Sequence, residues 1–196
     1  RHAQRAAHFP PDAKKVMRSL SSGEAAELLG VDHTYLRKLH REGKISDVET
    51  TAGSHRRYTL DDIWEIRHSL EANAKKPGTY VPGRRSGDEL QVVSVVNFKG
   101  GSGKTTTSAH LAQRLAFKGY RVLAIDLDPQ ASMSALHGIQ PELDLMEGGT
   151  LYDAVRYDDP VPISEVIRKT YIRGLDLIPG NLELMEFEHE TPAAIQ

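Results

Sequence analysis

The sequence predicts an α/β fold with a parallel sheet, only part of which lies in this chain, preceded by a small winged helix-turn-helix domain. Two short helical segments with capping signals, joined by Gly30-Val31, open the patterned part of the chain. A β-branched apolar run over residues 90–98 leads through a glycine-rich loop into a helical segment, and a second apolar run over residues 122–127 follows. These last three elements have the order of a right-handed strand–helix–strand unit.

The composition limits the class of protein. Cysteine is absent, which excludes a disulfide framework and a cysteine-ligated metal site within this segment. No apolar stretch reaches the roughly 20 residues that span a bilayer, so we expect a cytoplasmic protein. Residues 1–90 carry 16 Lys and Arg against 13 Asp and Glu, whereas residues 91–196 carry 9 against 14. This asymmetry favours the first half for any nucleic-acid surface.

Composition also divides the chain into four segments. A basic extension covers residues 1–18, a helix-turn-helix domain residues 19–72, a linker residues 73–89, and the first part of the α/β domain residues 90–196. The linker has almost no apolar periodicity and little to bury. We therefore expect the two domains to be separable.

Two helices with clear start signals begin the first domain. Ser21 and Glu24 form a capping box for a helix over residues 22–29. Asp32 caps a second helix that ends at Gly43. The short connection between these helices is typical of a helix-turn-helix.

A wing and a third helix complete this domain. Residues 47–58 are rich in turn formers and compatible with a hairpin, and Thr59 with Asp62 caps the helix that follows. We expect three aromatic residues to lie in the core rather than to stack on bases: Tyr35, Tyr58 and Trp64.

The α/β domain is predicted element by element. A helix over residues 105–118 ends at Gly119, and a buried strand covers residues 122–127. Further along, we expect a helix over residues 163–170 and a strand over residues 175–178. A doubly wound domain needs more strands than these, so the domain is incomplete here.

The glycine-rich loop carries the clearest chemical signal, because it lies where a strand turns into a helix. Its glycines let successive backbone amides converge on phosphate oxygens, and the helix adds its positive end. Lys104 supplies a charge for the β- and γ-phosphates, Thr105 ligates Mg²⁺, and Thr106 reaches the α-phosphate. We therefore expect ATP and Mg²⁺ as cofactors. The predicted phosphate-binding residues are Lys99, Gly100, Gly101, Ser102, Gly103, Lys104, Thr105 and Thr106.

Two acidic residues follow the second predicted strand. Alternation along that strand directs Asp126 and Asp128 to one side, at the carboxyl end where ligands bind in open α/β sheets. Both then face the phosphates. The alternative is that two acids merely end a strand.

The loop departs from the generic P-loop, with Phe98 in place of the first glycine and a lysine directly after it. This pattern resembles the deviant Walker A motif of the ParA/MinD ATPases. The resemblance implies that Lys99 reaches the other subunit's phosphates in a nucleotide-sandwich homodimer. It also implies that Asp126 belongs to the Mg²⁺ shell and that Asp128 positions the attacking water, with Gln130 close by. The implied catalytic residues are Lys99, Lys104 and Asp128. The family's Walker B aspartate has no counterpart before Gln196, so we expect hydrolysis in the intact protein rather than in this chain alone.

The first domain resembles the winged helix-turn-helix of MerR-like regulators through the Ala-Glu-Leu-Leu-Gly-Val segment over residues 26–31 and the basic helix after it. A recognition helix shows polar and basic side chains to base edges, and wing arginines suit phosphates or the minor groove. The alternative is that these charges only solvate a small interaction domain. The predicted DNA-binding residues are His33, Thr34, Arg37, Lys38, Arg41, Arg56 and Arg57.

The two domains together resemble the larger ParA partition proteins, and among them the RepA partition proteins of repABC-type plasmids. The resemblance implies a nucleoid-associated ATPase whose dimers coat double-stranded DNA, a ParB-type centromere-binding partner that stimulates hydrolysis, and repression of its own operator. One alternative is a nucleotide-sensing transcriptional repressor that moves no cargo. Another is a MinD-like membrane-cycling ATPase, and the fused DNA-binding module argues against it.

Overall fold

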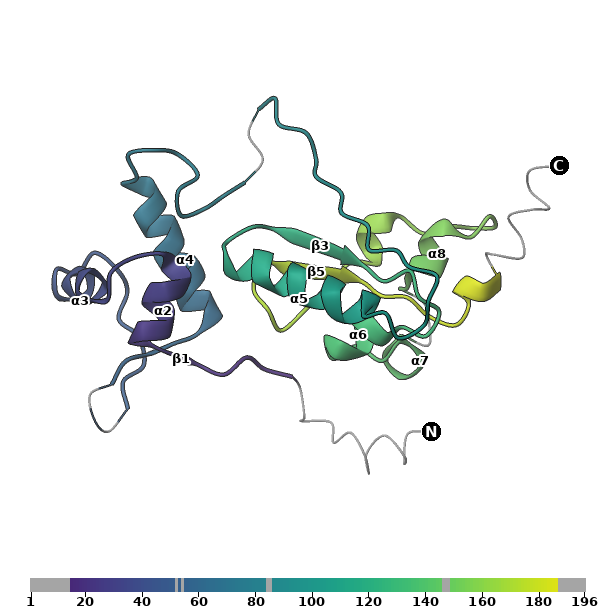
Figure 1. The fold of residues 1–196 in the computed structure, drawn as a ribbon, viewed down its shortest axis with the longest axis horizontal. Coiled ribbons are helices and arrows are strands. Elements are labelled where there is room, and N and C mark those ends of the chain that lie inside the picture. The colour runs from purple at the N-terminus through teal and green to yellow at the C-terminus, as the bar shows by residue number, and fades with distance from the viewer. Residues whose placement is uncertain (1–14, 52, 54, 84–85, 146–148, 187–196) are drawn as a thin grey trace.

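The computed structural model describes residues 15–51, 53, 55–83, 86–145 and 149–186. A small, mainly helical domain and an α/β domain lie side by side (Figure 1). The first contains a two-stranded sheet and the second a three-stranded sheet. Most of the predicted basic extension lies outside the described residues.

Three helices form the first domain, and each begins at a predicted cap. They are α2 (Ser22–Leu29), α3 (His33–Arg41) and α4 (Leu60–Ala72). Ser21 and Thr59 form capping boxes, and the Asp32 side chain accepts a hydrogen bond from the second amide of α3. Gly30 follows α2 with a φ of 70°, the left-handed conformation that glycine adopts without strain. These three predicted helices are confirmed.

The wing is a short antiparallel hairpin joined to the start of the domain. Strand β1 (Leu20–Ser21) pairs with β2 (Arg57–Tyr58), and an isolated bridge joins Thr50 to Arg56. Tyr58 is buried in the core, as predicted. The same expectation for Tyr35 is wrong, because its side chain is 42% exposed. The buried face of α3 comprises positions 36, 39 and 40, and Tyr35 lies beside that stripe.

The α/β domain is built on helix α5 (Lys104–Phe117) and a mixed sheet. Its strands are β3 (Val122–Ile125), β4 (Arg168–Lys169) and β5 (Leu175–Ile178). Strand β5 lies in the middle, parallel to β3 and antiparallel to β4. Four short helices are α6 (Ser132–Leu136), α7 (Pro141–Asp144), α8 (Leu151–Val155) and the 3-10 helix η1 (Ile163–Glu165). The predicted helix after the glycine-rich loop and the predicted strand over residues 175–178 are confirmed. The strand predicted over residues 122–127 ends two residues early, and its expected burial is wrong, because only Ala124 of β3 is buried.

The predicted helix over residues 163–170 is wrong. Only the 3-10 turn η1 forms there, and β4 follows it. Lys169 lies opposite Asp176 of β5, and its Nζ atom is 2.7 Å from the Asp176 Oδ2 atom. Val166, at 1% exposure, fills a core cluster with Ile178. Pairing with β5 thus outweighs the weak helical preference of this segment.

The predicted strand over residues 90–98 is also wrong in this structure. The segment is an exposed coil, in which Val92 and Val96 are 79% and 76% exposed. A strand needs a neighbour for its backbone hydrogen bonds, and none of the described strands runs beside this segment. The expected strand–helix–strand crossover is therefore not formed, and Leu123 and Ile125 of β3 remain 47% exposed.

The first part of the linker packs more tightly than expected. The Glu71 carboxylate on α4 accepts hydrogen bonds from the amides of Gly78, Tyr80 and Val81. Tyr80 also packs against the core of the first domain. Of the helices that the structure describes, none is long and apolar enough to cross a bilayer.

Candidate phosphate-binding loop and nucleic-acid interface

The glycine-rich loop curls directly before α5. Gly101 and Gly103 have φ angles of 69° and 83°, which glycine alone adopts readily. At the start of the loop, the Lys99 amide donates a 2.8 Å hydrogen bond to the Asn97 Oδ1 atom. At its end, the Lys104 Nζ atom lies 3.5 Å from the Lys99 carbonyl oxygen. The lysine side chain therefore folds back over the loop and holds its charge near the curled backbone.

The first turn of α5 offers amides that suit an anion. Gly103 is the N-cap and has no side chain with which to cap the helix. The first hydrogen bond inside the helix runs from the Thr107 amide to the Gly103 carbonyl, at 2.8 Å. The amides of Lys104, Thr105 and Thr106 precede that bond and receive no side-chain cap in the described residues. This donor set, beside the Lys104 cation, fits a phosphate group.

Asp126, directly after β3, anchors helix α6. Its side chain is 5% exposed, and its Oδ2 atom accepts hydrogen bonds from the amide and the hydroxyl of Ser134, at 2.8 and 2.7 Å. Among the described residues, the Oδ1 atom has only a long 3.4 Å contact, from the Asp128 amide. The Oδ2 atom of Asp126 therefore holds helix α6 in place, while its Oδ1 atom can still accept a further hydrogen bond or bind a cation. Neither oxygen makes a contact with Thr105 in the residues described.

The predicted Mg²⁺ ligands are Thr105 and Asp126. Across the described residues, no three His, Asp or Glu side chains gather as a protein metal cage. Magnesium is usually held by one or two protein oxygens together with phosphate oxygens and waters. A hydroxyl such as that of Thr105 and a carboxylate such as that of Asp126 are oxygen donors of the kind that such a site uses, although the described residues show no contact between the two side chains.

Asp128 lies in a different environment from Asp126. It is exposed, and its Oδ1 atom accepts a 2.9 Å hydrogen bond from the Gln130 amide. Because β3 ends at Ile125, the alternation of a strand does not extend to these two aspartates. One carboxylate is buried and the other faces solvent.

Two residues that support this site were missed in the sequence. One is Ser134, and the other is Gly180, which directly follows Pro179 at the end of β5. A Cβ atom at Gly180 would lie 2.7 Å from the Asp126 carbonyl oxygen and 2.8 Å from that of Asp128. Only glycine lets these backbones approach so closely. A Pro-Gly pair at the end of a predicted strand was the available signal.

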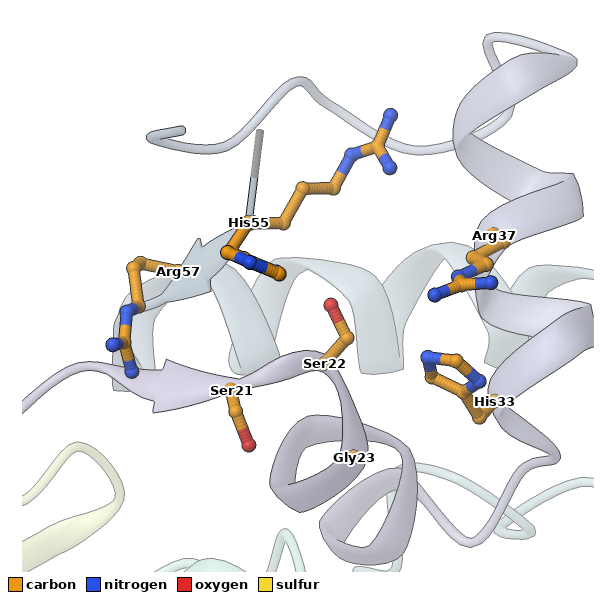
Figure 2. Close-up of a pocket in the computed structure, with 8 residues that line it drawn as sticks. Ser21, Ser22, Gly23, His33, Arg37, His55 and Arg57 are labelled. Carbon is orange, nitrogen blue, oxygen red and sulfur yellow. The ribbon is translucent and has the colours of Figure 1, made fainter. Parts of the chain in front are cut away.

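A basic pocket lies between α2, α3 and the wing. Figure 2 shows His33 and Arg37 of α3 on one side, His55 on the other, and Ser22 between them. The pocket lining consists of Ser21, Ser22, Gly23, His33, Arg37, His55, Arg56 and Arg57. Four of the predicted DNA-binding residues thus come together, from two elements more than 15 positions apart in sequence. His55 and the first residues of α2 were not predicted.

The other predicted DNA-binding residues lie along α3 outside the pocket. Thr34, Lys38 and Arg41 are exposed, and with Arg37 they follow the spacing of one helix face. The Lys38 Nζ atom lies 3.7 Å from a Glu42 carboxylate oxygen, an exposed pair with little energetic weight. The outer face of α3 is therefore polar and basic, while its inner face packs in the core.

The comparisons with known proteins match both halves of the chain. The model of a family described as an AAA domain matches residues 90–196, and that of the MerR HTH family of regulatory proteins matches residues 20–69. "Putative replication protein A" of Rhizobium rhizogenes is 55% identical over 188 residues, covering 95% of this chain and 46% of its own length. Protein SopA of Escherichia coli strain K12 is 34% identical over 187 residues, covering 92% of this chain and 45% of its own length.

A shorter match covers the second half. The chromosome partitioning protein ParA of Caulobacter vibrioides strain NA1000 is 42% identical over 105 residues, covering 54% of this chain and 38% of its own length. A solved structure named Partition Protein aligns with 96% of this chain and 52% of its own, at 20% identity and a TM-score of 0.49. The chain thus spans just under half the length of these Rhizobium rhizogenes and Escherichia coli relatives.

Proposed function

This chain belongs to the ParA family of partition ATPases with an amino-terminal helix-turn-helix, and from this premise we propose that it binds ATP and duplex DNA as part of a DNA-partitioning protein. In the intact protein, ATP hydrolysis follows from the same site. The observation that carries the proposal is the uncapped first turn of α5 behind a curled glycine loop, with the Lys104 cation folded over it.

At the phosphate site, each residue has a separate role. The amides at the start of α5 bind phosphate oxygens, and Lys104 neutralises their charge. Mg²⁺, held by Thr105 and Asp126, supplies further charge neutralisation when bound. Exposed Lys99 serves the phosphates of a second subunit. Asp128 orients the attacking water from the open side of the site.

At the DNA interface, the basic pocket receives a backbone phosphate. The amides of Ser22 and Gly23 lie at the positive end of α2, and Arg56 and Arg57 add charge from the wing. Arg37 and its neighbours on α3 face the groove and read base edges. Non-specific binding to phosphates falls steeply with salt, which suits the coating of nucleoid DNA.

We place this activity in partitioning, with a ParB-type protein that stimulates hydrolysis and operator repression through the winged domain. A nucleotide-sensing repressor uses the same two sites, and the direct hydrogen bond between the domains, from Arg67 to the Phe117 carbonyl, is compatible with it. Plasmid-loss frequency in a deletion strain separates the two: loss of partitioning raises it, whereas loss of repression alone changes transcript level.

The test of the phosphate site's family-specific role is Lys99→Ala in the intact protein. We expect nucleotide binding to persist while ATP-dependent dimers, measured by light scattering, are lost. Lys118→Ala, an exposed lysine just beyond the other end of α5, is the matched control and leaves dimerisation unchanged. ATP-driven dimers of the Lys99 variant at the level of the control would contradict the role across the interface.

A further inference from the structure

We propose that Arg67 couples the two domains, so that nucleotide at the start of α5 changes the affinity of the winged domain for DNA. The proposal rests on the proposed function, because it needs both ligands to bind. It adds the residue that transmits the effect and the surface through which the domains communicate.

Arg67 is a buried arginine on α4 whose guanidinium contacts three segments. Its side chain donates hydrogen bonds to the carbonyl oxygens of Leu28, Tyr80 and Phe117, the last two at 3.0 and 2.8 Å. Leu28 belongs to α2, Tyr80 to the linker, and Phe117 is the last residue of α5. One 4% exposed side chain therefore joins the DNA-binding domain, the linker and the ATPase domain.

The buried Arg67 cation is stabilised by backbone carbonyls at helix ends. The last carbonyls of a helix lack backbone partners and carry the negative end of the helix dipole. Around the end of α5, backbone amides bond to Arg114, Leu115 and Ala116, and Arg67 takes the next carbonyl, that of Phe117. No carboxylate of the described residues forms an ion pair with Arg67, and burial lowers its pKa. The cation therefore depends on carbonyls at the ends of two helices from two domains.

Neighbouring contacts enlarge this junction into a docking surface on α4, made of Asp61, Trp64 and Arg67. Trp64 lies so close to Gly174 that a Cβ atom there would be 2.8 Å from the indole ring. The Arg173 guanidinium lies 6.0 Å from the centre of the Trp64 ring, and its Nη1 atom is 3.4 Å from an Asp61 oxygen. Gly119, just beyond α5, lies against the Arg67 stem. The partner of this surface is thus the end of α5 and the turn before β5.

Helix α5 connects this surface to the phosphate loop. Its 14 residues span about 20 Å, from Lys104 at the loop to Phe117 at Arg67. A phosphate that draws the start of this helix toward itself shifts the far end against Arg67. Helix α4 in turn packs on α2 and on wing strand β2. Nucleotide at the phosphate loop therefore changes the affinity of the winged domain for DNA, and DNA changes the affinity for nucleotide by the same factor.

The test measures this coupling with this chain, ATP with Mg²⁺, and a short random-sequence duplex. We expect saturating ATP to change the duplex Kd by at least about fivefold, and saturating duplex to change the ATP Kd by the same factor. Arg67→Lys keeps the charge but cannot hold three carbonyls at once. In this variant we expect the coupling ratio, which is the Kd of one ligand without the other divided by its Kd with the other, to fall toward one. Each ligand alone should bind as in the wild type. Trp64, the chain's single tryptophan, reports on the junction directly, and its emission should shift on ATP addition in the wild type only.

Two further variants keep the result decisive. If circular dichroism shows that Arg67→Lys does not fold, Arg173→Ala tests the same surface from its exposed ATPase side and should also shrink the ratio. Arg121→Ala, exposed in the same domain, is its control and keeps the wild-type ratio. A variant of the junction that folds and retains the full ratio would overturn the proposal. Binding of both ligands to the wild type without any coupling would overturn it while leaving the proposed function intact, and binding of neither would remove both.

Discussion

The Nε2 atom of His40 lies 2.9 Å from the Tyr58 hydroxyl oxygen, so a buried polar contact joins helix α3 to wing strand β2. The two rings are 5.7 Å apart between centroids. Burial lowers the pKa of His40 and raises the pKa of Tyr58. The folded domain thus favours the neutral form of both groups, and the contact between them attaches the wing to α3.

The first prediction is a loss of stability in acid through His40. Its pKa is lower in the folded than in the unfolded state, where it is about 6.5, so folding favours the neutral ring. The stabilisation is complete above that value and declines as the pH falls through it toward the folded-state pKa. Urea unfolding at about pH 7.5 and about pH 5 should show a smaller difference in His40→Gln than in wild type. His68→Gln, exposed on α4, is the control, and an unchanged pH dependence in His40→Gln would reject the role.

Arg37 and Arg57 should differ in what they contribute to DNA binding. Arg37→Ala removes the proposed base contact, so we expect it to cost about 1–3 kcal/mol on a preferred site and much less on random duplex. Arg57→Ala removes the proposed phosphate contact, so it should weaken binding to both duplexes and reduce the salt dependence. Fluorescence anisotropy over a salt series measures both effects. Equal losses by the two variants on both duplexes would contradict this division.

Asp126 and Asp128 should separate stability from hydrolysis. Asp126→Ala leaves the buried Ser134 hydroxyl and amide without their acceptor, which costs about 1–3 kcal/mol for an unsatisfied buried group. Asp128→Ala, at an exposed position, should leave the melting temperature and ATP affinity unchanged and slow single-turnover hydrolysis in the intact protein. Normal hydrolysis by Asp128→Ala would show that another residue positions the attacking water. Loss of ATP binding would instead make Asp128 a binding residue.

Elements defined by local signals were predictable from the sequence. The capping residues Ser21, Asp32 and Thr59 fix where helices begin, and each signal lies within four residues of the backbone it caps. The strand over residues 175–178 was predictable because its apolar residues are closely flanked by turn formers on both sides. The glycine-rich loop belongs to the same class, since its glycines and its position before a helix are both local features.

Elements that depend on distant partners were not predictable. Residues 90–98 have the composition of a buried strand, but a strand also needs a neighbour, which the pattern of the segment does not specify. His40 and Arg67 are polar residues on helices, where periodicity alone predicts a solvated side chain. Their burial is decided by Tyr58 and by helix ends far along the chain. The pocket between α3 and the wing could be predicted only as separate basic residues.

ATP binding by this chain and by its Lys104→Ala variant, measured by isothermal titration calorimetry in the presence of Mg²⁺, tests the phosphate site most directly. The variant lacks the cation that folds over the loop, while the first turn of α5 and its amides remain. We expect wild-type chain to bind ATP and the variant to show no measurable heat of binding, with an unchanged circular dichroism spectrum. Equal ATP affinity in the two proteins would contradict the assignment of the phosphate site.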